Sequence, residues 1–127
     1  MIMNSKNILS SYAILTAFAG IAMLFLGDEV TTLLNVQSSP LINALLAALL
    51  FGFATTNWHS KNLTVGGVYG RPLVLGNLSH TLIGAISLVK IVAVNQNPLT
   101  IILTIIYAIY AAAFTWLMYT HPKTNNN

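Results

Sequence analysis

The stretch VGGVYGRPLVLGNLSHTLIG, residues 65–84, contains the features that decide the fold of this 127-residue chain. It begins with closely spaced glycines, continues through Arg71, the chain's only arginine, and Pro72, and then enters a long uncharged segment. Proline is tolerated in the first turn of a helix, where its missing N–H has no helical partner. The stretch therefore predicts a turn followed by an apolar helix over residues 73–94.

The composition around this stretch is that of a membrane protein. Hydrophobic residues make up 56% of the chain and charged residues only 6%, against roughly 25% charged in soluble domains. Three more apolar runs, at about residues 8–26, 41–58 and 99–119, are long enough at 1.5 Å per residue to cross the roughly 30 Å hydrocarbon layer. The sequence predicts an all-α polytopic membrane protein with four transmembrane helices.

The prolines support four spans in one domain, residues 1–127. Pro40, Pro72 and Pro98 each stand where a span begins, and Pro122 follows the last span. Ser39 and Asn97 precede two of them and are good helix caps. No proline interrupts a span, so we expect four uninterrupted helices in an up-down bundle.

The N-terminal apolar run admits a second interpretation. Lys6, the apolar residues and the small residues near Ala19 resemble a cleavable secretory signal. The apolar run continues to Leu26, beyond the expected cleavage site, so we interpret it as a spanning helix that is retained.

A short polar segment follows the first span. Gly27 is expected to end the first helix and Asp28 to cap a new turn through its side-chain oxygen. Val30, Leu33 and Leu34 fall on one face of a helix, which predicts a short amphipathic helix at the membrane surface. The alternative is a simple polar loop.

The basic residues predict the orientation. Lys6, Lys61, Arg71 and Lys123 fall on one side of a four-span chain, and Asp28 and Glu29 on the other. Because lysine and arginine concentrate in cytoplasmic loops, both termini should be cytoplasmic. Lys90 lies near the opposite surface and either extends to the headgroups or pairs, buried, with one of the two acids.

Small residues recur at four-residue spacing on each span and predict where helices pack closely. We expect them to form the internal contacts of the bundle, although the same pattern also fits an interface between copies of the chain. These positions are Thr16 and Gly20; Ala44, Ala48, Gly52 and Thr56; Gly76, His80 and Gly84; and Thr104, Ala108 and Ala112.

The candidate ligand-binding residues lie in one half of the membrane. An ionisable residue within a span is a functional candidate because its burial is costly unless it is satisfied. His80 is such a residue, and Asn77 lies one turn before it. With Arg71, Asn57 and Tyr12 they would form a polar pocket that faces the cytoplasm. The alternative is structural: His80 bridges helices through Asn57, Tyr12 or a backbone carbonyl, and Asn77 joins helices.

The glycines before Pro72 also have two interpretations. Gly66, Gly67 and Gly70 permit a tight turn with positive φ. Alternatively, their amides, with Lys61 and Arg71, hold an anion such as a lipid headgroup. Their spacing matches no nucleotide-binding motif.

Several kinds of chemistry are excluded or unsupported by the residues. The chain has no cysteine, and neither acidic residue lies in a span, so we expect no thiol chemistry, no metal site and no cofactor. No catalytic residue is assigned, and the lack of a basic stripe argues against a nucleic-acid partner.

The segments LGDEVTTLLNV, residues 26–36, and NWHSKNLTVGGVYGRPLVLGNLSH, residues 57–80, together with the four-span layout, resemble small bacterial four-helix membrane proteins that are broadly DoxX-like. The resemblance implies a protein of the bacterial cytoplasmic membrane. It implies no particular activity and no catalytic residue.

Three functions follow as hypotheses. The first is a scaffold or accessory protein that self-associates or joins a larger membrane complex. The second is binding or transport of a small lipophilic or anionic ligand, or a lipid, in the pocket around His80. The third and weakest is a membrane enzyme with His80 as a base, for which the sequence offers no nucleophile or acid.

Overall fold

The computed structural model describes residues 4–63 and 70–120, and the secondary structure in these ranges is entirely helical. Its five helices are α1 (Ser5–Phe25), α2 (Gly27–Leu33), α3 (Pro40–Ser60), α4 (Gly70–Val94) and α5 (Pro98–Tyr119). All except α2 are long and apolar enough to cross a membrane. The prediction of an all-α, multi-pass membrane protein with four spans is confirmed.

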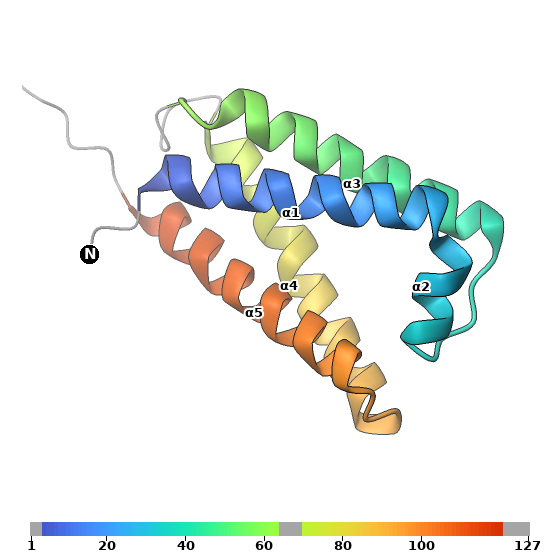
Figure 1. Cartoon of the computed structure of the whole chain (residues 1–127). Helices are drawn as coiled ribbons and strands as arrows, with labels where there is room; N and C mark the ends of the chain where they lie inside the picture. Colours follow the sequence, from blue (N-terminus) through green and yellow to red (C-terminus); the bar gives the residue numbers. More distant parts are fainter. Residues whose placement is uncertain (1–3, 64–69, 121–127) are drawn as a thin grey trace, which may run out of the picture.

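The four long helices form two antiparallel pairs, α1 with α3 and α4 with α5, that together have the shape of a V (Figure 1). The pairs meet where α1 and α4 begin and where α3 and α5 end. Lys6, Lys61 and Arg71 belong to this end, which we call the basic end. The pairs separate toward the other end, where α2 carries Asp28 and Glu29, and which we call the acidic end.

The spans begin close to the predicted positions because local capping defines them. Ser39 Oγ accepts a hydrogen bond from the Ile42 N–H at 3.3 Å, and Asn97 Oδ1 accepts one from the Leu99 N–H at 2.9 Å. Each cap is followed by a proline in the first turn. α1 starts three residues earlier than predicted because the Asn4 side chain accepts from the Lys6 N–H and caps it there.

The segment after the first span is a helix, as the first of the two alternatives predicted, but Asp28 does not cap it. The carboxylate of Asp28 instead accepts a hydrogen bond from Asn43 Nδ2 at 3.2 Å, which ties α2 to α3. A Cβ on Gly27 would come within 3 Å of Asn43 atoms, so glycine is required for this approach. α2 ends at Leu33, and Asn35, just after the C-cap residue Leu34, has the left-handed φ of 53° that often follows a helix end.

The main core lies at the basic end, where all four long helices meet. Its largest fully buried side chains are Phe114 of α5, Leu9 of α1 and Val74 of α4. A smaller apolar cluster, made of Met23, Ala47 and Leu50, joins α1 to α3 nearer the acidic end. Among the long helices, the buried apolar core shared by the two pairs therefore lies at the basic end.

The small-residue stripes were predicted correctly on α1 and only partly elsewhere. Thr16 and Gly20 are buried, and Gly20 packs against Phe51 and Ala47 of α3. The predicted stripe of α3 is exposed, and a neighbouring face packs on α1 instead; its buried residues are Asn43, Ala47, Leu50, Ala54 and Asn57. The alanine-rich α3 carries two stripes of small residues, and spacing alone does not distinguish them.

On α4 and α5 the predicted stripes also lie mostly outside the tightest contacts. Gly76, Ala108 and Ala112 are exposed, His80 and Thr104 are half-buried, and only Gly84 closely approaches the partner helix. Lys90 is exposed, which agrees with extension toward the headgroups and contradicts the buried ion pair.

Candidate functional site

The five predicted ligand-binding residues do not form one pocket; they separate into four places. Asn57 of α3 and Asn77 of α4 form the first group, and both are completely buried. Asn57 Nδ2 donates to Asn77 Oδ1 at 2.9 Å, and Asn77 Nδ2 donates to Asn57 Oδ1 at 2.5 Å. Asn57 Nδ2 also donates to the Phe53 carbonyl oxygen at 2.7 Å. The pair joins the two halves of the V and matches the structural interpretation of Asn77.

Tyr12 belongs to the core at the basic end. Its ring packs against Tyr110 and Phe114 of α5, with ring centroids 4.8 and 5.0 Å away, and against Phe53 of α3 at 6.4 Å. The hydroxyl is buried and has no hydrogen-bond partner within the described ranges. Tyr12 therefore contributes aromatic packing and does not bridge to His80.

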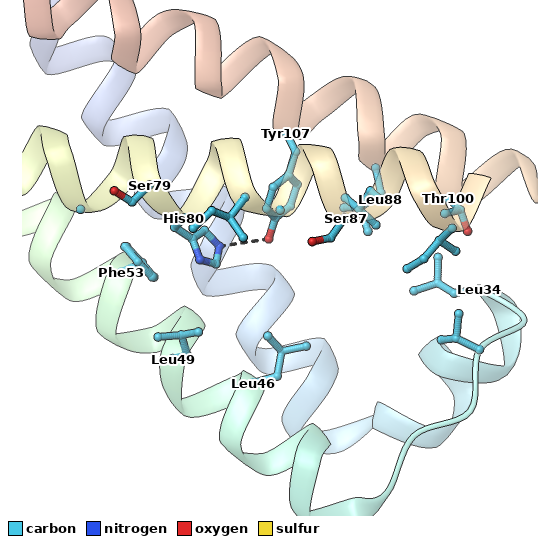
Figure 2. Close-up of a pocket in the computed structure, with 16 residues that line it drawn as sticks. Leu34, Leu46, Leu49, Phe53, Ser79, His80, Ser87, Leu88, Thr100 and Tyr107 are labelled. Carbon is cyan, nitrogen blue, oxygen red and sulfur yellow. Dashed lines mark hydrogen bonds between the residues drawn. The ribbon is translucent and has the colours of Figure 1, made fainter. Parts of the chain in front are cut away.

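His80 lies away from these core residues, on the face of α4 turned toward α3 and α5 (Figure 2). Its Nε2 is 3.1 Å from the hydroxyl oxygen of Tyr107 on α5, and its ring packs on Phe53 of α3 with centroids 4.4 Å apart. The sequence predicted Asn57 or Tyr12 as the hydrogen-bond partner of a structural His80. A backbone carbonyl was the third predicted partner. Tyr107 takes this place instead, because Asn57 is paired with Asn77 and Tyr12 packs in the core.

Gly84 allows Tyr107 to reach His80. A Cβ at Gly84 would overlap the Tyr107 ring, so a larger residue one turn below His80 would displace the tyrosine. Gly84 was predicted as a position where helices pack closely. Its lack of a side chain lets the aromatic ring of Tyr107 on α5 lie directly on α4.

The His80–Tyr107 pair forms part of the wall of a cavity of about 650 Å³ between α3, α4 and α5. The volume lies within the roughly 300–1,000 Å³ of typical small-molecule sites. Apolar side chains dominate the lining, among them Leu46, Leu49 and Phe53 of α3 (Figure 2). Leu49 and Ile83, on facing helices, are 50% and 65% exposed. The cavity therefore opens between α3 and α4 onto the surface that faces lipid.

The segment after α2 closes the cavity at the acidic end. Leu34 and Val36 line the cavity there. Asn97 Nδ2 donates to the Leu33 carbonyl oxygen at 2.8 Å, and Asn95 Nδ2 donates to the Asn35 carbonyl oxygen at 3.2 Å. These two bonds link one helix pair to the other across the wide end of the V.

The chemistry of the cavity favours an uncharged occupant. Within residues 4–63 and 70–120, the lining contains no aspartate, glutamate, lysine or arginine, and a charge would be costly to hold there. The lining still offers polar atoms to an occupant: the hydroxyls of Ser79 and Ser87, both exposed residues of α4, and one ring nitrogen of His80. His80 Nδ1 has no hydrogen-bond partner in the described part of the chain, and it is not among the enclosed atoms.

The pair offers one donor and one acceptor whichever tautomer it adopts. If the tyrosine O–H donates to Nε2, the histidine Nδ1–H is free to donate and the tyrosine oxygen to accept. If Nε2–H donates, Nδ1 accepts and the tyrosine O–H donates. A hydroxyl or carbonyl group of a lipophilic molecule is therefore complementary to the pair.

Thr100 is a polar residue of the cavity wall on α5. It is 2% exposed, and its hydroxyl has no hydrogen-bond partner among residues 4–63 and 70–120. Other threonines on the long helices, such as Thr81 and Thr104, donate to the carbonyl four residues earlier. The residue four positions before Thr100 is Gln96. Gln96 precedes α5, so its carbonyl oxygen is not in the helical position that accepts from such a threonine hydroxyl.

The residues predicted to bind an anion are separate from this cavity. Arg71 is exposed in the first turn of α4, and the Lys61 ammonium lies 3.1 Å from the centroid of the Trp58 ring. Gly70 is buried at the start of α4, and Gly66 and Gly67 lie outside the described residues. In the described ranges, no three histidine or acidic side chains gather in a way that could hold a metal ion.

Tyr107 and Phe53 were not predicted as partners of His80. The signal for Tyr107 was the α4–α5 hairpin, in which residues equally far from the turn lie opposite each other. Gly84 lies 12 residues before Gln96 and Tyr107 lies 11 after it, so these two residues face each other. Phe53 had no comparable signal, because α3 and α4 are not joined by a tight hairpin.

No protein-family model, curated protein or solved structure was found to match this chain. The resemblance to DoxX-like proteins stays a prediction.

Proposed function

We propose that this protein binds an uncharged lipophilic molecule, taken from the bilayer, in the cavity between α3, α4 and α5. One observation carries the proposal: the His80–Tyr107 pair lies on the wall of an otherwise largely apolar cavity that opens toward lipid. The occupant would place its hydrocarbon part against Leu46 and Leu49 and a hydroxyl or carbonyl group against His80 Nδ1. The proposal is of binding, not of catalysis.

A long-chain alcohol and the matching alkane test the proposal. Isothermal titration calorimetry in detergent micelles would compare 1-decanol with n-decane for the wild type and for the double variant His80→Phe/Tyr107→Phe. The double variant keeps both rings and removes the polar atoms. We expect it to bind 1-decanol about 3- to 10-fold more weakly, the effect of about one net hydrogen bond, with no loss of n-decane binding.

The matched control is His59→Phe/Tyr119→Phe, which makes the same chemical changes at exposed residues outside the cavity. It should bind 1-decanol as the wild type does. Equal binding of 1-decanol by the wild type and by the cavity variant would reject the proposal.

We also propose that the chain lies in the bacterial cytoplasmic membrane with both termini cytoplasmic. The separation of charge supports this orientation, because Lys6, Lys61 and Arg71 belong to one end and both acids to the other. Cysteine labelling tests it in this cysteine-free chain. A membrane-impermeant maleimide applied to intact cells should label Asp28→Cys and spare Lys6→Cys; the opposite pattern would reject the orientation.

Self-association is a second candidate function, favoured by the exposed small-residue face of α3. Ala44 and Ala48 point away from α1, and small residues allow helices to approach closely in lipid. Mass measurement across a dilution series in detergent should show a dimer or larger assembly that Ala48→Leu weakens and Ala93→Leu, at an exposed position of α4, does not. A monomer at every concentration would reject this candidate.

A further inference from the structure

A second apolar groove, of about 320 Å³, runs between α3 and α4 from the cavity toward the basic end. It shares Leu49, Phe53 and Gly76 with the cavity and extends to Thr56 and Pro72. Groove and cavity therefore form one continuous depression in the surface that faces lipid.

Two glycines keep this α3–α4 groove open. Gly52 of α3 and Gly76 of α4 both line it, and a Cβ at either position would meet no atom within 4 Å. Neither glycine is needed for a close helix contact. Their missing side chains instead create open space along the groove.

The walls of the groove suit a hydrocarbon chain. The Thr56 hydroxyl donates to the Gly52 carbonyl oxygen at 2.6 Å, and the Asn77 side chain is paired with Asn57. The polar groups that border the groove are thus already satisfied by the protein, and apolar surface is what remains for an occupant.

The mouth of the groove at the basic end favours a negative headgroup. Arg71 directly precedes Pro72 in the groove wall and is exposed, and Lys61 belongs to the same end. Both acidic residues of the chain, Asp28 and Glu29, lie at the acidic end. Exposed basic residues beside a membrane attract anionic lipids by about 1 kcal/mol each.

We propose that the α3–α4 groove is a site for one acyl chain of an anionic phospholipid, whose phosphate contacts Arg71. From Pro72 to His80 the helix rises about 12 Å. Over this length the acyl chain would pass Gly76 and end beside the cavity, where it would form part of the cavity wall between α3 and α4. This lipid site is separate from the His80–Tyr107 contact of the proposed function.

Native mass spectrometry tests the site after exchange of the protein from a bilayer containing equal amounts of phosphatidylglycerol and phosphatidylcholine. The wild type should retain one lipid, with phosphatidylglycerol favoured at least fivefold. Gly76→Leu, which fills the groove without contacting protein atoms at its Cβ, should lower retention of both lipids at least fivefold. Arg71→Gln should remove the headgroup preference while a lipid is still retained.

The controls are Ala93→Leu and Lys6→Gln, which make similar changes at exposed positions outside the groove; both should behave as the wild type. Retention by Gly76→Leu equal to that of Ala93→Leu, or a wild type without headgroup preference, would overturn the proposal. His80→Phe/Tyr107→Phe should retain lipid normally, so failure of the lipid site and failure of alcohol binding are distinguishable.

Discussion

Asn57 of α3 and Asn77 of α4 exchange two side-chain hydrogen bonds, of 2.9 and 2.5 Å, at the end of the molecule where the two helix pairs meet. Both side chains are inaccessible to solvent. α3 and α4 diverge from this end of the molecule (Figure 1), so the amide pair joins the two halves of the V near its apex.

Replacing one asparagine of this pair should lower the free energy of unfolding more than replacing both. Asn77→Leu leaves the Asn57 amide without its partner in an apolar core, a loss of about 1–3 kcal/mol. Asn57→Leu/Asn77→Leu should recover part of that loss, since no buried amide is then unsatisfied. Unfolding titrations in sodium dodecyl sulfate would measure a coupling energy of about 0.5–2 kcal/mol. Strictly additive single effects would contradict the described pairing.

Substitution of Gly84 by alanine should disturb helix packing, whereas the same substitution at Gly76 should not. Gly84→Ala forces the Tyr107 ring away from α4, with an expected loss of about 1–3 kcal/mol from overpacking. Gly76→Ala meets no atom within 4 Å and should gain about 0.5–1 kcal/mol of helix stability. The same unfolding titrations would check the pair; equal effects of the two alanines would be inconsistent with the contact.

Asn97 has two functions that a single substitution separates. Its Oδ1 caps α5, and its Nδ2 donates to the Leu33 carbonyl. Asn97→Asp keeps the capping oxygen and removes the donor, so α2 should be held less firmly by the α4–α5 turn, through the Asn95–Asn35 bond alone, while α5 stays intact. Hydrogen–deuterium exchange should become faster in residues 27–36 and stay unchanged in residues 99–105. Unchanged exchange in residues 27–36 would show that this bond does not hold α2.

The hydroxyl of Tyr12 should be dispensable. It is buried and finds no hydrogen-bond partner in the part of the chain that the structure describes, so Tyr12→Phe should leave stability unchanged or raise it by up to about 1 kcal/mol. Tyr107→Phe, in contrast, removes the hydrogen-bond partner of His80 and should lower the free energy of unfolding by about 1 kcal/mol. Thermal unfolding in detergent compares the two variants. A larger loss of stability for Tyr12→Phe than for Tyr107→Phe would contradict the hydrogen bonding described for the two hydroxyls.

The helices could be predicted from the sequence because each span has its own local signal. Ser39-Pro40 and Asn97-Pro98 define helix starts through contacts within three residues, and the apolar runs define the lengths. The pairing of helix faces could not be predicted for α3, since Ala44 and Ala48 look the same in sequence as the face around Ala47 that packs on α1.

The candidate site was predicted in part for the same reason. His80 is conspicuous as an ionisable residue in an apolar run, but its partner depends on the rotation of α5. Tyr107 and Tyr110 are one turn apart on α5, yet Tyr107 contacts His80 on α4 while the Tyr110 hydroxyl donates to Ser11 on α1. Spacing did not indicate which tyrosine faces which helix, nor that Asn57 and Asn77 would satisfy each other.

Photo-crosslinking is the most direct test that the cavity holds a lipophilic molecule beside His80. A long-chain alcohol with a diazirine next to its hydroxyl group would be irradiated with the protein in bilayers, and the labelled residues mapped by peptide mass spectrometry. We expect labelling concentrated at residues 79–88, at 103–107 and near Phe53, and lost in the presence of excess 1-decanol. Even labelling of lipid-facing residues such as Phe18 and Ile109, without competition, would contradict the proposed binding site.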